Sequence, residues 1–201
     1  MTKPRFQTDL ISPDDYLTGE NDGTWRHEYV NGEVYAMAGA SRRHNMISGN
    51  ISGHLYPVLT SPCRVFSADM KIKFEGDAEH IYYYPDVFVS CSTADGGVYF
   101  ETEPRLIFEV LSKTTERNDK FEKRLVYQQI PSLLEYVLVA QEFRRVDLYR
   151  RRTAWAKETF KDDAIVNFES IGQSLSLDQI YRDIDFSVSA DSVSVLGNPS
   201  T

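Results

Sequence analysis

Cysteine is scarce in this sequence, and long apolar runs are missing. Only two cysteines occur, Cys63 and Cys91, far apart and without the spacing of metal ligands. No apolar run approaches the length that spans a membrane, and no leader of basic, apolar and small residues opens the chain. We therefore expect a soluble, reduced, cytoplasmic protein without a membrane partner.

An excess of positive charge is also missing. The net charge is −8 and the isoelectric point is near 5.0, which excludes a uniformly basic surface for nucleic acid but not a local basic groove. Hydrophobic residues make up 41% and aromatic residues 12% of the chain, enough for the core of one domain. We predict a single domain over residues 1–186 and a flexible, serine-rich tail over residues 187–201.

Cap and turn signals predict the elements of the first third. Ser12 followed by Pro13 is typical of a helix start, and we expect Gly19 and the ENDG run over residues 20–23 to end this helix early. Asn31-Gly32 between two aromatic-rich runs is a strong signal for a β-hairpin. Apolar residues at steps of four, four and three predict a helix over residues 41–59, with Ile47, Ile51, Leu55 and Val58 on its buried face.

The rest of the chain alternates between strands and helices. We predict strands over residues 64–74, 81–90, 106–111, 135–140, 146–151 and 155–160, the last two paired around Thr153. A helix is expected over residues 115–129, ended by Pro131, and a short one near residues 175–184. This order predicts an α/β or α+β fold with a central sheet between helices.

Two carboxylates interrupt apolar strands. Asp86 follows a proline in YYYPDVFVSC, and Glu109 lies in RLIFEVLS. Burying an ionised carboxylate without a partner is costly. If the two strands are neighbours, the pair must hold a cation or raise the pKa of one acid. An equally good interpretation places each at a strand end, in contact with water or an arginine.

Further charged residues lie on predicted apolar faces. Lys123 lies in one stripe of the helix over residues 115–129, so its ammonium points towards whatever that stripe covers. A lysine that extends over apolar surface to reach water explains the same pattern. In the hairpin, Glu28 and Glu33 share one sheet face, where they could add an acidic ligand or contact water.

Four segments of the chain resemble, in order and spacing, the Uma-two family of putative restriction endonucleases, part of the PD-(D/E)XK nuclease superfamily. They read RHEYVNGEVYAMAGASRRHN, YYYPDVFV, LIFEVLS and EKRLVYQQIPSLLEYVLV. The likeness runs from about residue 13 to residue 149. It implies a restriction-endonuclease-like core, with a central mixed β-sheet flanked by helices and an N-terminal β-hairpin. It also implies metal-dependent hydrolysis of phosphodiester bonds in DNA.

The resemblance also implies roles for single residues. Asp86 and Glu109 match the acids that ligate Mg²⁺ or Mn²⁺, and the carbonyl of Val110 matches the usual backbone ligand. Leu111 stands where the superfamily has its lysine, and Lys123 matches a lysine displaced to the following helix. Three further family positions are matched. Tyr127 lies one helical turn after Lys123, Glu33 and Glu28 match the acidic hairpin, and His44 matches a histidine that opens the second helix. Lys123 is expected to orient or deprotonate the attacking water, or to stabilise the transition state.

Basic residues that flank this site in sequence are candidates for phosphate contacts. They are Arg42, Arg43, Lys113, Arg117, Lys120 and Arg124, each of which could also be an ordinary solvated charge. A homodimer is compatible with cutting two strands. Two alternatives remain open. One is an inactive nuclease-fold module that binds nucleic acid or a protein, and the other is a zinc hydrolase that uses His27, His44 and His54.

Overall fold

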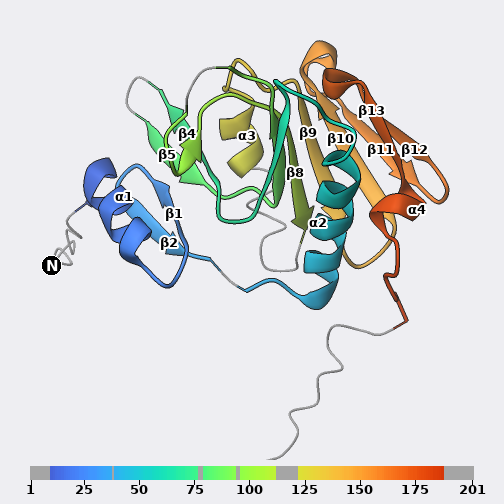
Figure 1. Ribbon diagram of the computed structural model, residues 1–201, viewed down its shortest axis with the longest axis horizontal. Helices are drawn as coiled ribbons and strands as arrows, with labels where there is room; N and C mark the ends of the chain where they lie inside the picture. The colour runs from blue at the N-terminus through green and yellow to red at the C-terminus, as the bar shows by residue number, and fades with distance from the viewer. Residues whose placement is uncertain (1–9, 38, 77–78, 94–95, 112–121, 188–201) are drawn as a thin grey trace, which may run out of the picture.

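The structure is a computed structural model and describes residues 10–37, 39–76, 79–93, 96–111 and 122–187. Two sheets and the helices between and beside them form an α+β fold (Figure 1). Within the described residues the helices are α1 (Pro13–Asp22), α2 (Arg42–Leu55), α3 (Arg124–Tyr127) and α4 (Leu177–Ile180), and 3₁₀ turns lie at Arg151–Thr153 and Glu169–Ile171.

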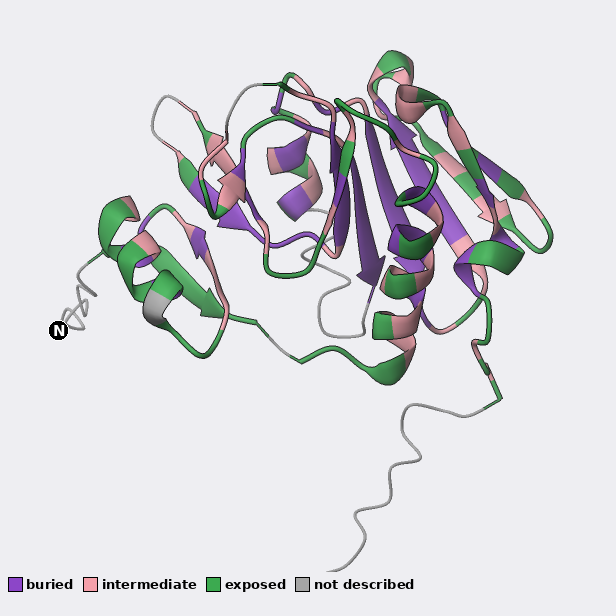
Figure 2. Cartoon of the chain, viewed as in Figure 1, coloured by how far each residue is buried: buried purple, intermediate pink, exposed green. Residues whose placement is uncertain are grey.

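The larger sheet has six strands and forms the centre of the molecule. In spatial order they are β11 (Lys157–Lys161), β10 (Arg145–Arg150), β9 (Glu135–Ala140), β8 (Pro104–Leu111), β6 (Val87–Ser90) and β3 (Arg64–Ser67). The sheet is mixed, because β8 and β9 run parallel whereas its other neighbours run antiparallel. Figure 2 shows the central strands buried, in keeping with their mainly apolar sequences.

The smaller sheet has five strands. In spatial order they are β2 (Glu33–Ala36), β1 (His27–Val30), β5 (His80–Tyr83), β4 (Lys71–Glu75) and β7 (Phe100–Glu101). A third pair, β12 (Ile165–Phe168) with β13 (Gln173–Ser176), lies beside α2 and α4.

Three apolar clusters hold these layers together. One face of the larger sheet packs against α2, α4 and the β12–β13 pair. Its opposite face packs against α3 and the smaller sheet, so that α3 lies between the two sheets (Figure 1). The aromatic rings of Tyr16, Tyr29 and Tyr82 fix α1 to the smaller sheet. Candidate residues singled out in the sequence come from α2, from the start of α3 and from both sheets, and they line one cleft.

Local signals account for the helix starts and the hairpin. The Ser12 side chain accepts a hydrogen bond from the Asp15 backbone, and Ser41 caps α2 in the same way. Asn31 and Gly32 have φ of 50° and 96°, as a two-residue hairpin turn requires. Gly19 does not end α1, which continues to Asp22 and ends within the predicted ENDG run.

Three further expectations need correction. The second helix ends at Leu55, so Val58 lies beyond it and is exposed. Residues 64–74 form two strands in different sheets, because Ala68 and Asp69 take positive φ and turn the chain. Residues 81–90 are likewise divided, since Pro85 cannot donate to a sheet ladder. The β12–β13 hairpin is not predicted from the sequence. Of the helix expected over residues 115–129, residues 115–121 lie outside the described residues, as does the predicted tail beyond residue 187.

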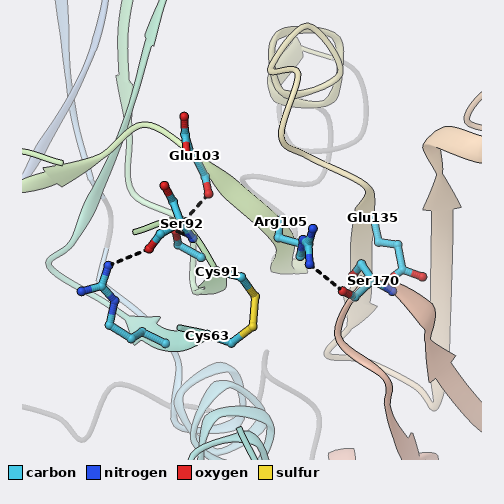
Figure 3. The surroundings of a disulfide bond; sticks show 9 residues. Cys63, Cys91, Ser92, Glu103, Arg105, Glu135 and Ser170 are labelled. Carbon is cyan, nitrogen blue, oxygen red and sulfur yellow. Dashed lines mark hydrogen bonds between the residues drawn. A yellow bond between two sulfur atoms is a disulfide. The ribbon is translucent and has the colours of Figure 1, made fainter. Parts of the chain in front are cut away.

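Cys63 and Cys91 form a disulfide, which contradicts the expectation of a reduced protein (Figure 3). Strand β3 pairs with β6 so that Arg64 lies opposite Ser90, and the next position on each strand is a cysteine. The bond therefore links the edge strand to its neighbour. Within the described ranges, no helix is both long and apolar enough to cross a bilayer.

Candidate active site

The two carboxylates singled out in the sequence come from neighbouring strands. Val87 of β6 lies opposite Phe108 of β8, so the next register position places Asp86 opposite Glu109. Side chains of directly opposed residues point to the same face of a sheet. The backbone nitrogen of Val110 donates a hydrogen bond to Asp86 Oδ2 at 2.6 Å, which fixes the Asp86 carboxylate against β8.

Lys123, directly before α3, and Tyr127, at its end, both reach Glu109. The Lys123 ammonium lies 3.6 Å from Glu109 Oε1, and the Tyr127 hydroxyl donates to the same oxygen at 3.2 Å. Residues four apart on a helix share a face, which explains why both arrive together. Glu109 and Tyr127 are buried, and burial raises the pKa of the Tyr127 hydroxyl well above its ordinary value. Tyr127 therefore remains a neutral hydrogen-bond donor.

Glu28 holds the ammonium of Lys123 more closely than Glu109 does. Its Oε1 lies 2.7 Å from Lys123 Nζ and accepts a second hydrogen bond from the Tyr84 backbone at 3.2 Å. The ring of Tyr83 lies 5.3 Å from the same ammonium, and burial raises the pKa of Tyr83 to about 12. Lys123 is thus held between two carboxylates and an aromatic ring.

Glu33 occupies a different position from Glu28. The register pairs Glu28 with Tyr35 and Val30 with Glu33, as the turn predicts. Glu33 is exposed, and its carboxylate accepts a hydrogen bond from the Tyr35 hydroxyl. The structure therefore brings Glu28, and not Glu33, to the lysine.

His44 lies in the first turn of α2 and reaches Asp86. Its Nε2 is 3.1 Å from Asp86 Oδ2. The other two histidines of the zinc alternative lie elsewhere, since His27 contacts Glu20 and His54 contacts the carbonyl of Asn50. The three imidazoles consequently do not form one site.

A cleft of about 960 Å³ opens over these groups. Asp86, Glu109, Lys123 and His44 line it, together with Glu28 and one face of the β1–β2 hairpin. Hard divalent cations prefer oxygen ligands, and the two carboxylates with the Val110 carbonyl are such a donor set. Among the described residues, no three His, Cys, Asp or Glu side chains form a group that could hold a metal ion. The set fits Mg²⁺, which keeps several of its own waters and needs only one or two carboxylates.

Of the six basic residues predicted to contact phosphates, the three that the structure describes do not share one surface. Arg42 is exposed, whereas Arg43 contacts Glu142 and the carbonyl of Asp185, on the side of α2 that faces the C-terminal segment. The guanidinium of Arg124 lies over the ring of Tyr149. The remaining three, Lys113, Arg117 and Lys120, lie outside the described residues.

The sequence did not predict a row of hydrogen-bonded, buried polar side chains next to the cleft. Lys71 donates to the Tyr84 hydroxyl at 3.1 Å, which donates to Glu20 at 2.9 Å. All three residues are buried, and burial lowers the pKa of Lys71 and raises that of Tyr84. Tyr84 directly precedes Pro85, and its backbone nitrogen donates to Glu28. These hydrogen bonds therefore support the segment that carries Asp86. The spacing of these residues gave no signal of it.

With this geometry established, the chain can be compared with known proteins. The family model described as "Putative restriction endonuclease", Uma2, matches residues 13–179. The chain belongs to the Uma2 family. Two proteins of Synechocystis sp., described as uncharacterized proteins slr1290 and sll1609, are each 34% identical to it. The alignment with slr1290 covers 88% of this chain and 94% of the relative, and that with sll1609 covers 72% and 82%.

A solved structure confirms the fold of this Uma2 protein. The crystal structure of a putative nuclease belonging to DUF820 from Anabaena variabilis superposes with a TM-score of 0.69 at 18% sequence identity. The match covers 85% of this chain and 97% of that one. The expected restriction-endonuclease-like fold, with central mixed sheets flanked by helices, is therefore confirmed.

Proposed function

We propose that this Uma2 protein is an endonuclease that hydrolyses phosphodiester bonds in DNA with a divalent metal ion. The observation that supports it most is that Asp86 and Glu109 line one cleft from neighbouring strands. The Asp86 carboxylate accepts a hydrogen bond from the backbone nitrogen next to Glu109, and the ammonium of Lys123 lies 3.6 Å from Glu109. Family membership supports a nuclease in general terms.

Asp86, Glu109 and the Val110 carbonyl would hold Mg²⁺ or Mn²⁺. The bound ion supplies neutralisation of phosphate charge and a water molecule of lowered pKa. His44 and the Val110 backbone nitrogen both bind Asp86 Oδ2, which orients the second oxygen of that carboxylate for a ligand. Tyr127 orients Glu109 in the same manner.

Lys123 would act on the attacking water or on the developing phosphoryl charge. Glu28, 2.7 Å from the ammonium, holds this lysine within 3.6 Å of Glu109. Arg42, Lys113, Arg117 and Lys120 are proposed to contact the phosphates of the strand. A homodimer is proposed as well, because cutting both strands needs two sites.

A plasmid-nicking assay tests the proposal. Purified protein with Mg²⁺ or Mn²⁺ should nick or cut supercoiled DNA, and Asp86→Asn or Glu109→Gln should lower the rate by at least about a hundredfold. Asp163→Asn, at an exposed position outside the cleft, is the matched control and should leave the rate unchanged. Cleavage that survives both site substitutions would come from a contaminating nuclease and would contradict the proposal.

An inactive nuclease-fold module that binds nucleic acid or a protein is the second candidate. It is favoured by the finding that, in the described part of the chain, no three acidic, histidine or cysteine side chains gather around one point. Such a module need not bind metal. An intact plasmid, together with no heat of binding in a titration with Mn²⁺, would favour this candidate.

A further inference from the structure

One wall of the cleft is formed by exposed aromatic and thioether side chains. Trp25 is 77% exposed, Tyr35 48% and Met37 40%, and all three line the cleft. Figure 2 shows β2 and the segment that follows it exposed. Large apolar side chains that line a cleft without being covered are typical of a binding surface.

The hairpin register directs Tyr35 and Met37 towards the candidate active site, and Trp25 lines the same cleft. Tyr35 lies directly opposite Glu28, so both side chains share one face of the hairpin. Glu28 on that face binds the ammonium of Lys123. The Met37 backbone nitrogen donates to the Arg26 carbonyl, which continues the same pairing by one position. The apolar wall is therefore continuous with the catalytic candidates.

The charges of the cleft are poorly suited to a long duplex. Arg26 forms an ion pair with Asp69, and Lys123 lies between Glu28 and Glu109. The described lining has more acidic than basic side chains, and the whole molecule carries a charge of −8. Phosphate contacts are the main source of affinity for duplex DNA, whereas a single strand gains further affinity from base stacking, so a lining with few cations favours a strand whose bases can stack. Aromatic rings stack only on bases that have left the base-paired stack.

We propose that the Trp25–Tyr35–Met37 wall stacks against unpaired bases of a DNA strand, so that the preferred substrate is single-stranded or locally unpaired DNA. This inference rests on the proposed nuclease function and names the substrate class of the same cleft. Each stacked base contributes affinity without sequence readout, because every base has a π face. The wall then positions a strand so that its phosphate lies near Asp86 and Glu109.

The experiment uses Trp25 as its own reporter. The chain has two tryptophans, so Trp155→Phe leaves Trp25 as the single indole. With Ca²⁺ in place of Mg²⁺, the full chain is titrated with oligothymidylate, with a duplex of equal length, and with an abasic strand of equal length. Oligothymidylate should quench Trp25 fluorescence and bind at least tenfold more tightly than the abasic strand, and the duplex should not quench. Equal binding of oligothymidylate and the abasic strand would overturn the proposal.

Substitutions give the second readout, by anisotropy of a labelled strand. Trp25→Ala and Tyr35→Ala should each weaken oligothymidylate binding by about five- to a hundredfold. Tyr56→Ala, at an exposed tyrosine outside the cleft, should have no effect. If Trp25→Ala leaves binding unchanged but converts a dimer to a monomer in sedimentation, the wall joins two copies and the proposal is wrong.

The two proposals fail separately. Cutting of single-stranded DNA at the same rate by the wild type and by Trp25→Ala, and no faster than cutting of duplex DNA, would overturn the stacking wall and leave the nuclease intact. Stacking of oligothymidylate on a protein that cuts no DNA with Mg²⁺ or Mn²⁺ would support the wall and overturn the nuclease.

Discussion

Replacing Lys123 with methionine removes one positive charge from between two carboxylates while keeping most of the side-chain volume. At an effective dielectric constant of about 20, the attraction is about 6 kcal/mol to Glu28 at 2.7 Å and about 5 kcal/mol to Glu109 at 3.6 Å. Desolvation of the three charges offsets most of this attraction. Removal of one partner from a buried ion pair costs about 3–5 kcal/mol, because it leaves a buried charge uncompensated.

We expect Lys123→Met to lower the free energy of unfolding by about 3 kcal/mol, the lower end of that range. Glu28 keeps the Tyr84 backbone nitrogen as a donor, and Glu109 keeps the hydroxyl of Tyr127, so neither carboxylate is left without a partner. Urea unfolding measures the loss as a shift of the midpoint at constant slope. Lys157→Met, at an exposed lysine of β11, is the control and should change stability by less than about 0.5 kcal/mol.

A double-mutant cycle with Glu28→Gln isolates the ion pair itself. The double variant should be more stable than the sum of the single losses predicts, by about 1–3 kcal/mol. Neither Lys123→Met nor the double variant with Glu28→Gln should cut DNA, even at temperatures where both are folded. Losses that simply add, or a cost below about 1 kcal/mol for Lys123→Met, would refute the argument that the ammonium is held by these carboxylates.

Two further predictions concern stability. The folded state keeps Tyr83 and Tyr127 neutral, because burial raises the pKa of Tyr83 to about 12 and that of Tyr127 well above its ordinary value. Stability from these groups is therefore complete below a pH of about 10 and is lost as the pH rises towards 12. A melting temperature that stays constant over that range, with tyrosinate absorbance followed in parallel, would contradict this. Reduction of the Cys63–Cys91 bond, which spans 28 residues of sequence, should cost about 3–4 kcal/mol in urea unfolding. An unchanged urea midpoint under reducing conditions would contradict the predicted contribution of the disulfide to stability.

The elements that the sequence predicts well are those set by neighbouring residues. The Asn31-Gly32 turn, the Ser12 and Ser41 caps and the strand over residues 135–140 all depend on local backbone preferences. Residues 64–74 were predicted as one strand, because nothing in their composition indicates that the chain turns at Ala68 and leaves one sheet for the other. Which strands pair is decided by tertiary packing, which no short segment encodes.

The candidate site shows the same division. Asp86 and Glu109 stand out in the sequence as charges within apolar strands, but their meeting depends on β6 lying beside β8. Glu28 and Glu33 share a face of the hairpin, and only the packing of the hairpin against α3 decides that Glu28 reaches Lys123. The disulfide was not expected for a similar reason, since it follows from the pairing of β3 with β6.

Calorimetric titration with Mn²⁺ tests the central claim most directly, namely that Asp86 and Glu109 together hold a divalent ion beside Lys123. The wild-type chain should bind Mn²⁺ with measurable heat, and Asp86→Asn and Glu109→Gln should each abolish that binding while both variants remain folded by circular dichroism. Asp163→Asn should bind as the wild type does. No binding by the wild type, or binding that survives both substitutions, would contradict the account.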